Sequence, residues 1–333
     1  TLPDGSRVQA SIAKDVTTKG PTFSIRKFRK IPYSPIDLVE LKTASADMMA
    51  YLWLITEHGA SILICGGVSS GKTSLLNCLT TFIHPEDKVI SIEDTRELNI
   101  PHKNWIPAVS RSGFGILEST GKRYGDVSLF DLLKESFRMR PDYVIVGEVR
   151  GEEAYVMFQG IASGHPSMGT LHAATLDDAV RRLATPPIKL SASLIEALDV
   201  AIIVSHAREK GEAARRIKDI IEVEDVDEKT KKARGIDVFS WIASTDEFRE
   251  SVAQSQLLRR IAAESGIDYG YLIEELKARK RVIDWMLRYR VAQFDHVAQV
   301  INMYYTDRKS VMDIVKKDYN PFRMRLFGDF PEK

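Results

Sequence analysis

The chain has 333 residues, which allows one large domain or two domains of ordinary size. Its hydrophobic fraction of 44% supports a packed core and argues against wholesale disorder, and a formal net charge of +1 gives no global positive field for nucleic acid. Two cysteines are too few for a disulfide framework or a four-cysteine zinc site. With so few cysteines, a reducing cytoplasm fits best. No apolar run reaches membrane-spanning length, and no signal peptide is recognisable.

The first part of the chain predicts two short strands, at residues 1–13 and 22–28. Because two strands alone are only marginally stable in water, we expect residues 1–30 to be the end of a larger N-terminal α+β domain. Two prolines then precede a new helical pattern, which predicts a linker at residues 31–42.

An alternation of strands and helices follows. Runs rich in β-branched residues predict strands buried on both faces of a sheet, at residues 61–65, 88–94, 142–148, 167–173 and 200–205. Amphipathic helices are predicted at residues 128–140, where Ser128 and Asp131 have capping-box spacing, and at residues 175–184. This alternation predicts a mostly parallel α/β sheet.

Beyond about residue 240 the pattern becomes helical. Amphipathic segments at 255–266, 271–289 and 295–305 predict a C-terminal helical bundle. The mixed acidic and basic stretch at 222–235 is interpreted as a solvated turn or the tip of a hairpin.

The stretch GGVSSGKTSLL at residues 66–76 matches the pattern G-x-x-x-x-G-K-[ST] between a predicted strand and a predicted helix. Such glycines let main-chain amides surround phosphate oxygens at the positive end of a helix. Lys72 would reach the β- and γ-phosphates, and Thr73 would hold Mg²⁺. The context disfavours the alternative, a glycine–serine turn without a ligand. The residues predicted to bind ATP are Gly66, Gly67, Val68, Ser69, Ser70, Gly71, Lys72, Thr73 and Ser74.

Two predicted strands end in carboxylates, which would converge at the crevice of a doubly wound sheet. One ends in Glu93 and Asp94, with Glu97 close behind, and the other ends in Glu148. Gly147 stands where phosphate-loop ATPases commonly carry an acid, so Glu148 is assigned to Mg²⁺ and Glu93 to orienting or deprotonating water. The alternative is that these acids are only surface charges.

His172 follows another predicted strand and could sense the γ-phosphate or bridge to Glu148. On spacing alone, a structural histidine is slightly favoured. His165 is interpreted as a loop residue.

Four segments, GGVSSGKTSLLN, SIEDTREL, RPDYVIVGEVRGEEA and ASGHPSMGTLHA, occur in that order. They resemble the Walker A, Asp-box, Walker B and His-box motifs of the secretion ATPase superfamily, the hexameric motors of type II and type IV secretion, type IV pili and the archaellum. The resemblance covers roughly residues 1–240. It implies a RecA-like P-loop NTPase core at 43–245, followed by a C-terminal helical region at 246–333.

The resemblance also implies roles for individual side chains. Glu93 corresponds to the proposed catalytic glutamate, Glu148 to the Walker B acid, and His172 becomes a functional rather than a structural histidine. The full catalytic set that it implies is Glu93, Glu148, His172, Arg150, Arg7 and Arg26, with Thr73 and Glu148 as metal ligands.

Each of the three arginines in that set has two alternative roles. Arg7 and Arg26 would reach ATP phosphates when the N-terminal domain closes, and otherwise are solvated strand charges. Arg150 would act with Glu148 or face a neighbouring subunit.

The resemblance implies an ATP-hydrolysing homo-hexamer that works through a polytopic membrane platform protein, at the inner face of the cell membrane and without nucleic acid. The chain lacks the four-cysteine zinc insert of bacterial type II secretion and pilus-extension members, and its tail is more similar to that of archaellum and archaeal pilus motors. A nucleic-acid-translocating RecA-like motor and a nucleotide-binding scaffold without turnover are the alternatives.

Overall fold

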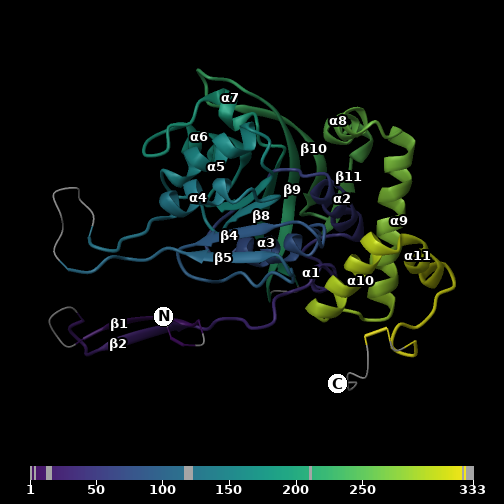
Figure 1. Ribbon diagram of the computed structural model, residues 1–333, viewed down its shortest axis with the longest axis horizontal. Helices are drawn as coiled ribbons and strands as arrows, with labels where there is room; N and C mark the ends of the chain where they lie inside the picture. The colour runs from purple at the N-terminus through teal and green to yellow at the C-terminus, as the bar shows by residue number, and fades with distance from the viewer. Residues whose placement is uncertain are drawn as a thin grey trace.

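A nine-stranded sheet forms the centre of the computed structural model, which describes residues 2–3, 5–12, 17–115, 123–209, 212–324 and 326–327 (Figure 1). The strand order is β11-β10-β9-β8-β3-β7-β6-β4-β5, parallel from β8 to β5 and antiparallel from β8 to β11. The strands are β3 (Ile62–Gly66), β4 (Val89–Glu93), β5 (Trp105–Val109), β6 (Tyr143–Val146), β7 (Ser167–Leu171), β8 (Val200–Glu209), β9 (Glu212–Val226), β10 (Ala233–Ile242) and β11 (Glu247–Glu250).

Helices cover both faces of this sheet (Figure 1). On one face lie α1 (Pro35–Glu40), α2 (Ala46–Glu57), α3 (Lys72–Thr80), α8 (Gln256–Ser265), α9 (Tyr269–Arg288), α10 (Phe294–Thr306) and α11 (Arg308–Lys316). On the other lie α4 (Leu129–Arg138), α5 (Glu153–Ala162), α6 (Leu176–Ala184) and α7 (Ala192–Ile195). The apolar run of β3 is continuous because both faces of the strand are buried. Ile62 and Ile64 pack in the core on the α2 face, whereas Leu63 and Cys65 pack in the core on the α5 face.

The C-terminal helices share a core with the sheet. Residues 48–56 of α2 are all buried, and this helix packs against α9. Trp53 stacks on Phe82 after α3 and meets Tyr304 of α10 edge to face, with ring centroids 5.8 and 4.9 Å apart. The short helix η1 (Val252–Gln254) leads from the sheet into this layer.

Local signals explain where several elements begin and end. Ser128 and Asp131 form the predicted capping box: Asp131 N donates to Ser128 Oγ at 3.2 Å, and Ser128 N donates to Asp131 Oδ2 at 3.1 Å. The predicted hairpin tip is also confirmed, because residues 227–232 join the antiparallel strands β9 and β10. The edge strand β5 was not predicted; it carries Pro107, which breaks the pattern of a strand in sequence.

The strand order, with the strand before the glycine loop at its centre, confirms the predicted RecA-like P-loop core with a mostly parallel sheet and a C-terminal helical region. Across the described ranges, no helix has the length and hydropathy needed to cross a bilayer.

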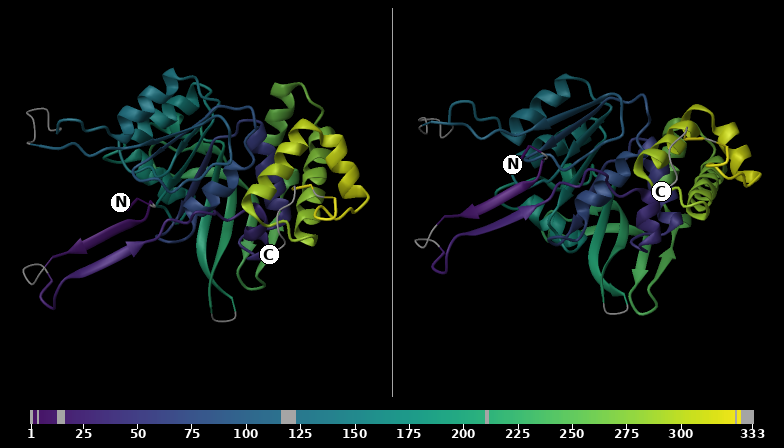
Figure 2. Two further views of the ribbon diagram at one scale, coloured as in Figure 1. Left: turned by 60° about the horizontal axis from the view of Figure 1, so that its bottom comes forward. Right: turned by 90° about the horizontal axis from the view of Figure 1, so that it is seen from below.

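A second, two-stranded sheet projects from the body (Figure 2). It pairs β1 (Arg7–Ser11) with antiparallel β2 (Thr22–Arg26). The segment that joins it to the core includes α1, whose residues Pro35, Ile36 and Leu38 are buried. The predicted limits of the domains and of the linker remain predictions.

Candidate nucleotide-binding site

A cavity of about 1050 Å³ lies at the carboxyl ends of the parallel strands. The loop after β3, the end of β4 and the residues that follow β6 and β7 all contribute to its wall. These strands run in the same direction, so their ends meet at one edge of the sheet, as predicted. The described residues at this edge include Lys72, Glu93, Glu148 and His172. These residues are widely separated along the chain, and the fold brings them together.

The glycine loop and helix α3 provide a site for an anion. The cap residue Gly71 has φ of 99°, a left-handed conformation that suits glycine, and no side chain caps the first amides of α3. These amides therefore lack an intrahelical partner and a capping group. The Ser70 hydroxyl is buried and has no hydrogen-bond partner in the described structure. Free donors of this kind at a helix N-terminus fit a phosphate group.

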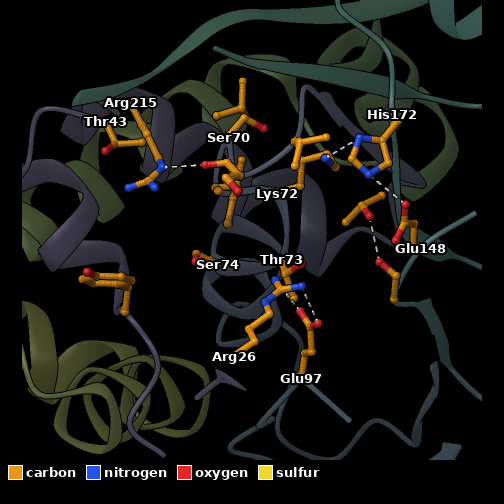
Figure 3. A pocket seen from close by; sticks show the side chains of 18 of the residues that line it. Arg26, Thr43, Ser70, Lys72, Thr73, Ser74, Glu97, Glu148, His172 and Arg215 are labelled. Atoms are coloured by element: carbon orange, nitrogen blue, oxygen red, sulfur yellow. Dashed lines mark hydrogen bonds and ion pairs between the residues drawn. The ribbon is translucent and has the colours of Figure 1, made fainter. Parts of the chain in front are cut away.

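Lys72, His172 and Glu148 form a chain of polar contacts (Figure 3). Lys72 Nζ donates to the carbonyls of Gly66 and Gly67 at 3.1 and 2.8 Å and lies 3.2 Å from His172 Nδ1. Because an ammonium group can only donate, Nδ1 accepts and Nε2 carries the proton. Nε2 lies 2.9 Å from Glu148 Oε1. Burial and the charge of Lys72 lower the pKa of His172, which keeps the ring neutral at pH 7.

Glu148 is held in its ionised form. Burial alone would raise its pKa, but the hydrogen bond and the charge of Arg150, together with His172 and Lys72, lower the pKa below the ordinary value. Arg150 contacts the Glu148 carboxylate directly and lies 3.7 Å from Asp94 Oδ2. Of the two predicted roles for Arg150, the structure brings it to Glu148. A carboxylate and the Thr73 hydroxyl, both in the cavity wall, are oxygen donors of the kind that Mg²⁺ prefers.

Glu93 has the opposite environment. Its side chain is buried, and burial raises the pKa of Glu93 to about 7, despite the main-chain amides that favour its charged form. Oε1 accepts from Glu97 N at 2.9 Å and from Leu98 N at 3.1 Å, while Oε2 is buried without a partner among the described residues. Gly147 makes room for this side chain, because a Cβ there would lie 2.9 Å from Glu93 Cγ. This contact explains why a glycine replaces the usual acid.

Arg7 and Arg26 lie at the rim of the cavity, on β1 and β2. Both contact Glu97: Arg7 Nη2 is 3.0 Å and Arg26 Nη1 is 3.3 Å from Glu97 Oε1. Arg7 also donates to the Thr95 carbonyl at 3.3 Å. The structure therefore brings both predicted arginines to the site, with a carboxylate as their partner.

Two residues of the site were missed by the sequence analysis. His206 of β8 and Arg215 of β9 are directly paired across the ladder, and each bonds a carbonyl of the glycine loop (Figure 3 shows Arg215). His206 Nε2 donates to Val68 O at 3.0 Å, and Arg215 Nε donates to Ser69 O at 3.0 Å. Ser69 has φ of 59°, which is uncommon for a residue other than glycine, and the bond from Arg215 helps to hold it. Neither residue lies in a motif, and only the pairing of β8 with β9 brings them to the loop.

The opposite end of the cavity is less polar. Its wall there includes Tyr33, Leu38, Leu41 and Thr43, from α1 and its flanking residues. The cavity is thus charged where the glycine loop and strand ends meet and more apolar toward α1. That division fits a ligand with a phosphate end and a ring end. The assignment of catalytic and binding roles to individual residues remains a proposal.

Comparison with known proteins identifies the family of this chain. The family model described as "Type II/IV secretion system protein" matches residues 1–261. Two uncharacterized proteins of Methanocaldococcus jannaschii are similar: MJ1287 is 42% identical over 245 residues (74% of this chain, 88% of that protein), and MJ0900 is 37% identical over 312 residues (92% and 55%). The chain thus spans about half the length of MJ0900.

A bacterial relative has a more specific name. The type IV secretion system protein PtlH of Bordetella pertussis is 34% identical over 252 residues, which cover 66% of this chain and 73% of PtlH. The family match over most of the chain, together with these relatives, shows that the chain belongs to the family of type II/IV secretion system proteins.

Proposed function

We propose that this chain binds Mg²⁺–ATP in the cavity and hydrolyses its γ-phosphate bond. The observation that carries this proposal is the meeting of Lys72, His172 and Glu148 in one chain of polar contacts beside the glycine loop, with Glu93 buried nearby. The uncapped amides of α3 and the Lys72 ammonium would bind the phosphates. The apolar end of the cavity would hold the base.

The two carboxylates have different environments, which support different roles. Glu148 has a lowered pKa and stays ionised at pH 7, as a metal ligand must. Glu93 has a pKa of about 7 and one unpartnered oxygen, as suits a general base that accepts a proton from the attacking water. Environments that separate the pKa values of two acids are a recurrent way to divide catalytic roles.

The Thr73 hydroxyl and the Glu148 carboxylate would hold Mg²⁺, and the metal would supply positive charge that offsets the charge developing on the phosphate oxygens. Arg7 and Arg26 would add two further cations from the β1–β2 sheet, and Arg150 would hold Glu148 in place. His172 would couple Lys72 to Glu148, because its ring contacts both side chains.

At the level of the cell, we propose that the chain works as a cytoplasmic homo-hexamer at the inner face of the membrane. There it would drive assembly or rotation of an archaellum-like or type IV pilus-like filament, or protein secretion, through a polytopic platform protein. The family membership and the M. jannaschii relatives support this proposal. No nucleic acid is expected as a partner, because the chain carries a net charge of only +1.

The test is an ATPase assay on the purified chain, with and without Mg²⁺ and single-stranded DNA, beside Lys72→Ala. We expect Mg²⁺-dependent turnover that DNA leaves unchanged and that Lys72→Ala abolishes, because the ammonium group contacts the phosphates in both ground and transition states. Strong stimulation by DNA would favour a nucleic-acid motor. Tight ATP binding without turnover, also in the presence of a platform protein, would favour a scaffold.

A further inference from the structure

Arg7 and Arg26 share one anion. They are directly opposite each other in the β1–β2 ladder, so two positive side chains project from neighbouring positions on the same face. Both guanidinium groups reach the Glu97 carboxylate: Arg7 at 3.0 Å to Oε1, and Arg26 at 3.3 Å to each of the two oxygens (Figure 3 shows Arg26 and Glu97).

This arrangement needs an anion. Like charges directly opposite each other across a ladder destabilise it. A carboxylate between them removes that repulsion, and guanidinium groups bind carboxylates and phosphates with the same geometry. In the structure Glu97 supplies the negative charge. A polyphosphate in the cavity would supply the same chemistry, because Arg7, Arg26 and Glu97 all line the cavity that contains Lys72.

The bridge is weak enough to be exchanged. The Arg26 side chain is 68% exposed and that of Arg7 is 35% exposed, so solvent and salt screen the contact. Ion pairs of this exposure contribute little to stability. A ligand with several phosphate oxygens and more negative charge than one carboxylate would therefore displace it.

We propose that Glu97 is a positioning residue that keeps Arg7 and Arg26 at the cavity before nucleotide binds and then competes with the phosphates for them. This inference rests on the proposed function, since it requires both arginines to contact the phosphates. When a triphosphate binds, the contacts of Arg7 and Arg26 with the Glu97 carboxylate are broken. That carboxylate then lies beside the negative charge of the phosphates. Neutralising Glu97 should consequently tighten nucleotide binding, the opposite of what loss of a ligand contact would do.

Glu97 is also joined to the proposed base. Its main-chain N–H donates to Glu93 Oε1, and this bond does not involve the Glu97 side chain. Glu97→Gln removes the charge but leaves the main-chain bond in place. The substitution should therefore change affinity for ATP through its charge alone, while the main-chain bond to Glu93 stays in place.

The experiment measures the affinity of the chain for a non-hydrolysable ATP analogue with Mg²⁺ by calorimetry. Four proteins form a cycle: the original chain, Glu97→Gln, the pair Arg7→Ala with Arg26→Ala, and all three substitutions together. We expect Glu97→Gln to tighten binding about three- to tenfold, and the arginine pair to weaken it. In the triple variant the effect of Glu97→Gln should largely vanish. Glu135→Gln removes the partner of Arg138 on α4, away from the cavity, and serves as the matched control.

The outcomes separate the two proposals. If the original chain does not bind the analogue, the proposed function fails and this inference fails with it. If it binds, but Glu97→Gln leaves affinity unchanged or weakens it, the inference alone is overturned. Equal tightening with and without the arginines would also overturn it, because that result would reflect general repulsion between Glu97 and the phosphates. Circular dichroism would establish that each variant is folded.

Discussion

The inner wall and the outer rim of the cavity are built in different ways. The inner wall consists of side chains at strand ends, between two large cores: Lys72 is 7% and Glu93 4% exposed. The rim depends on the β1–β2 sheet and on exposed residues of β8 and β9, His206 and Arg215, which reach the site through a few polar contacts. The β1–β2 sheet even leaves Phe23 77% exposed. Positions on the inner wall are thus fixed by packing, whereas those on the rim depend on exchangeable contacts.

This difference predicts that substitutions in the inner wall and at the rim will have different effects. Substitutions in the inner wall should reduce turnover, because a transition state requires fixed geometry. Substitutions at the rim should change affinity by smaller factors, because exposed contacts are individually weak. Four experiments could break or sharpen this division, and the two substitutions with the largest expected effects on turnover come first.

Glu148→Gln should retain ATP binding and lower kcat by about 10²- to 10³-fold, because it removes the negative charge that Mg²⁺ and His172 require. Calorimetry would measure affinity and a phosphate-release assay would measure turnover. Glu135→Gln on α4 again provides a control outside the cavity. Turnover close to that of the original chain would remove Glu148 from the mechanism.

Glu93→Gln should lower kcat by about 10²- to 10⁴-fold, the range for loss of a general base. In the original chain, kcat should fall as the pH drops below 7, because the pKa of Glu93 is raised to about 7 and its base form is lost there. The pH–rate profile of the variant should lack this limb. A limb of unchanged position in the variant would assign the titration to another group.

The same substitution should stabilise the fold at high pH. The folded state keeps the Glu93 proton up to about pH 7, whereas the ordinary pKa is 4.5, so ionisation of this buried group destabilises the folded chain as the pH rises between these values. Glutamine avoids that cost. Urea unfolding should show the variant more stable by up to about 3 kcal/mol at pH 8 and nearly equal at pH 4. Equal stability at both values would contradict the burial argument.

The sequence predicted the inner wall better than the rim, for a physical reason. The inner wall carries short motifs in which glycine, lysine and acids follow strand patterns, and parallel strands bring their ends together by geometry alone. Lys72, Glu148 and His172 could be placed in this way. A bridge from His172 to Glu148 was one of the two roles predicted for this histidine. Its hydrogen bond with Lys72 and the resulting tautomer were not predicted, since they depend on distances that no motif specifies.

The rim illustrates what a pattern of residues leaves undetermined. The resemblance predicted roles for Arg7 and Arg26, but their common partner Glu97 depends on where the β1–β2 sheet lies relative to the cavity. Likewise, the antiparallel edge from β9 to β11 was predicted only as a hairpin tip. His206 and Arg215 could not be assigned to the loop without the register of β8 and β9.

Arg215→Ala provides the smallest and sharpest test, because Arg215 bonds the glycine loop from outside. Loss of one exposed hydrogen bond to Ser69 O should weaken ADP binding about two- to fivefold, with kcat nearly unchanged. His206→Ala should have a similar or smaller effect, and the double variant should show less than the sum, because both side chains hold adjacent carbonyls of one loop. Hydrogen exchange of residues 66–72 in the absence of nucleotide should increase in each variant. If Arg215→Ala instead reduced kcat a hundredfold, the rim would be part of the catalytic geometry, and the division between wall and rim would be wrong.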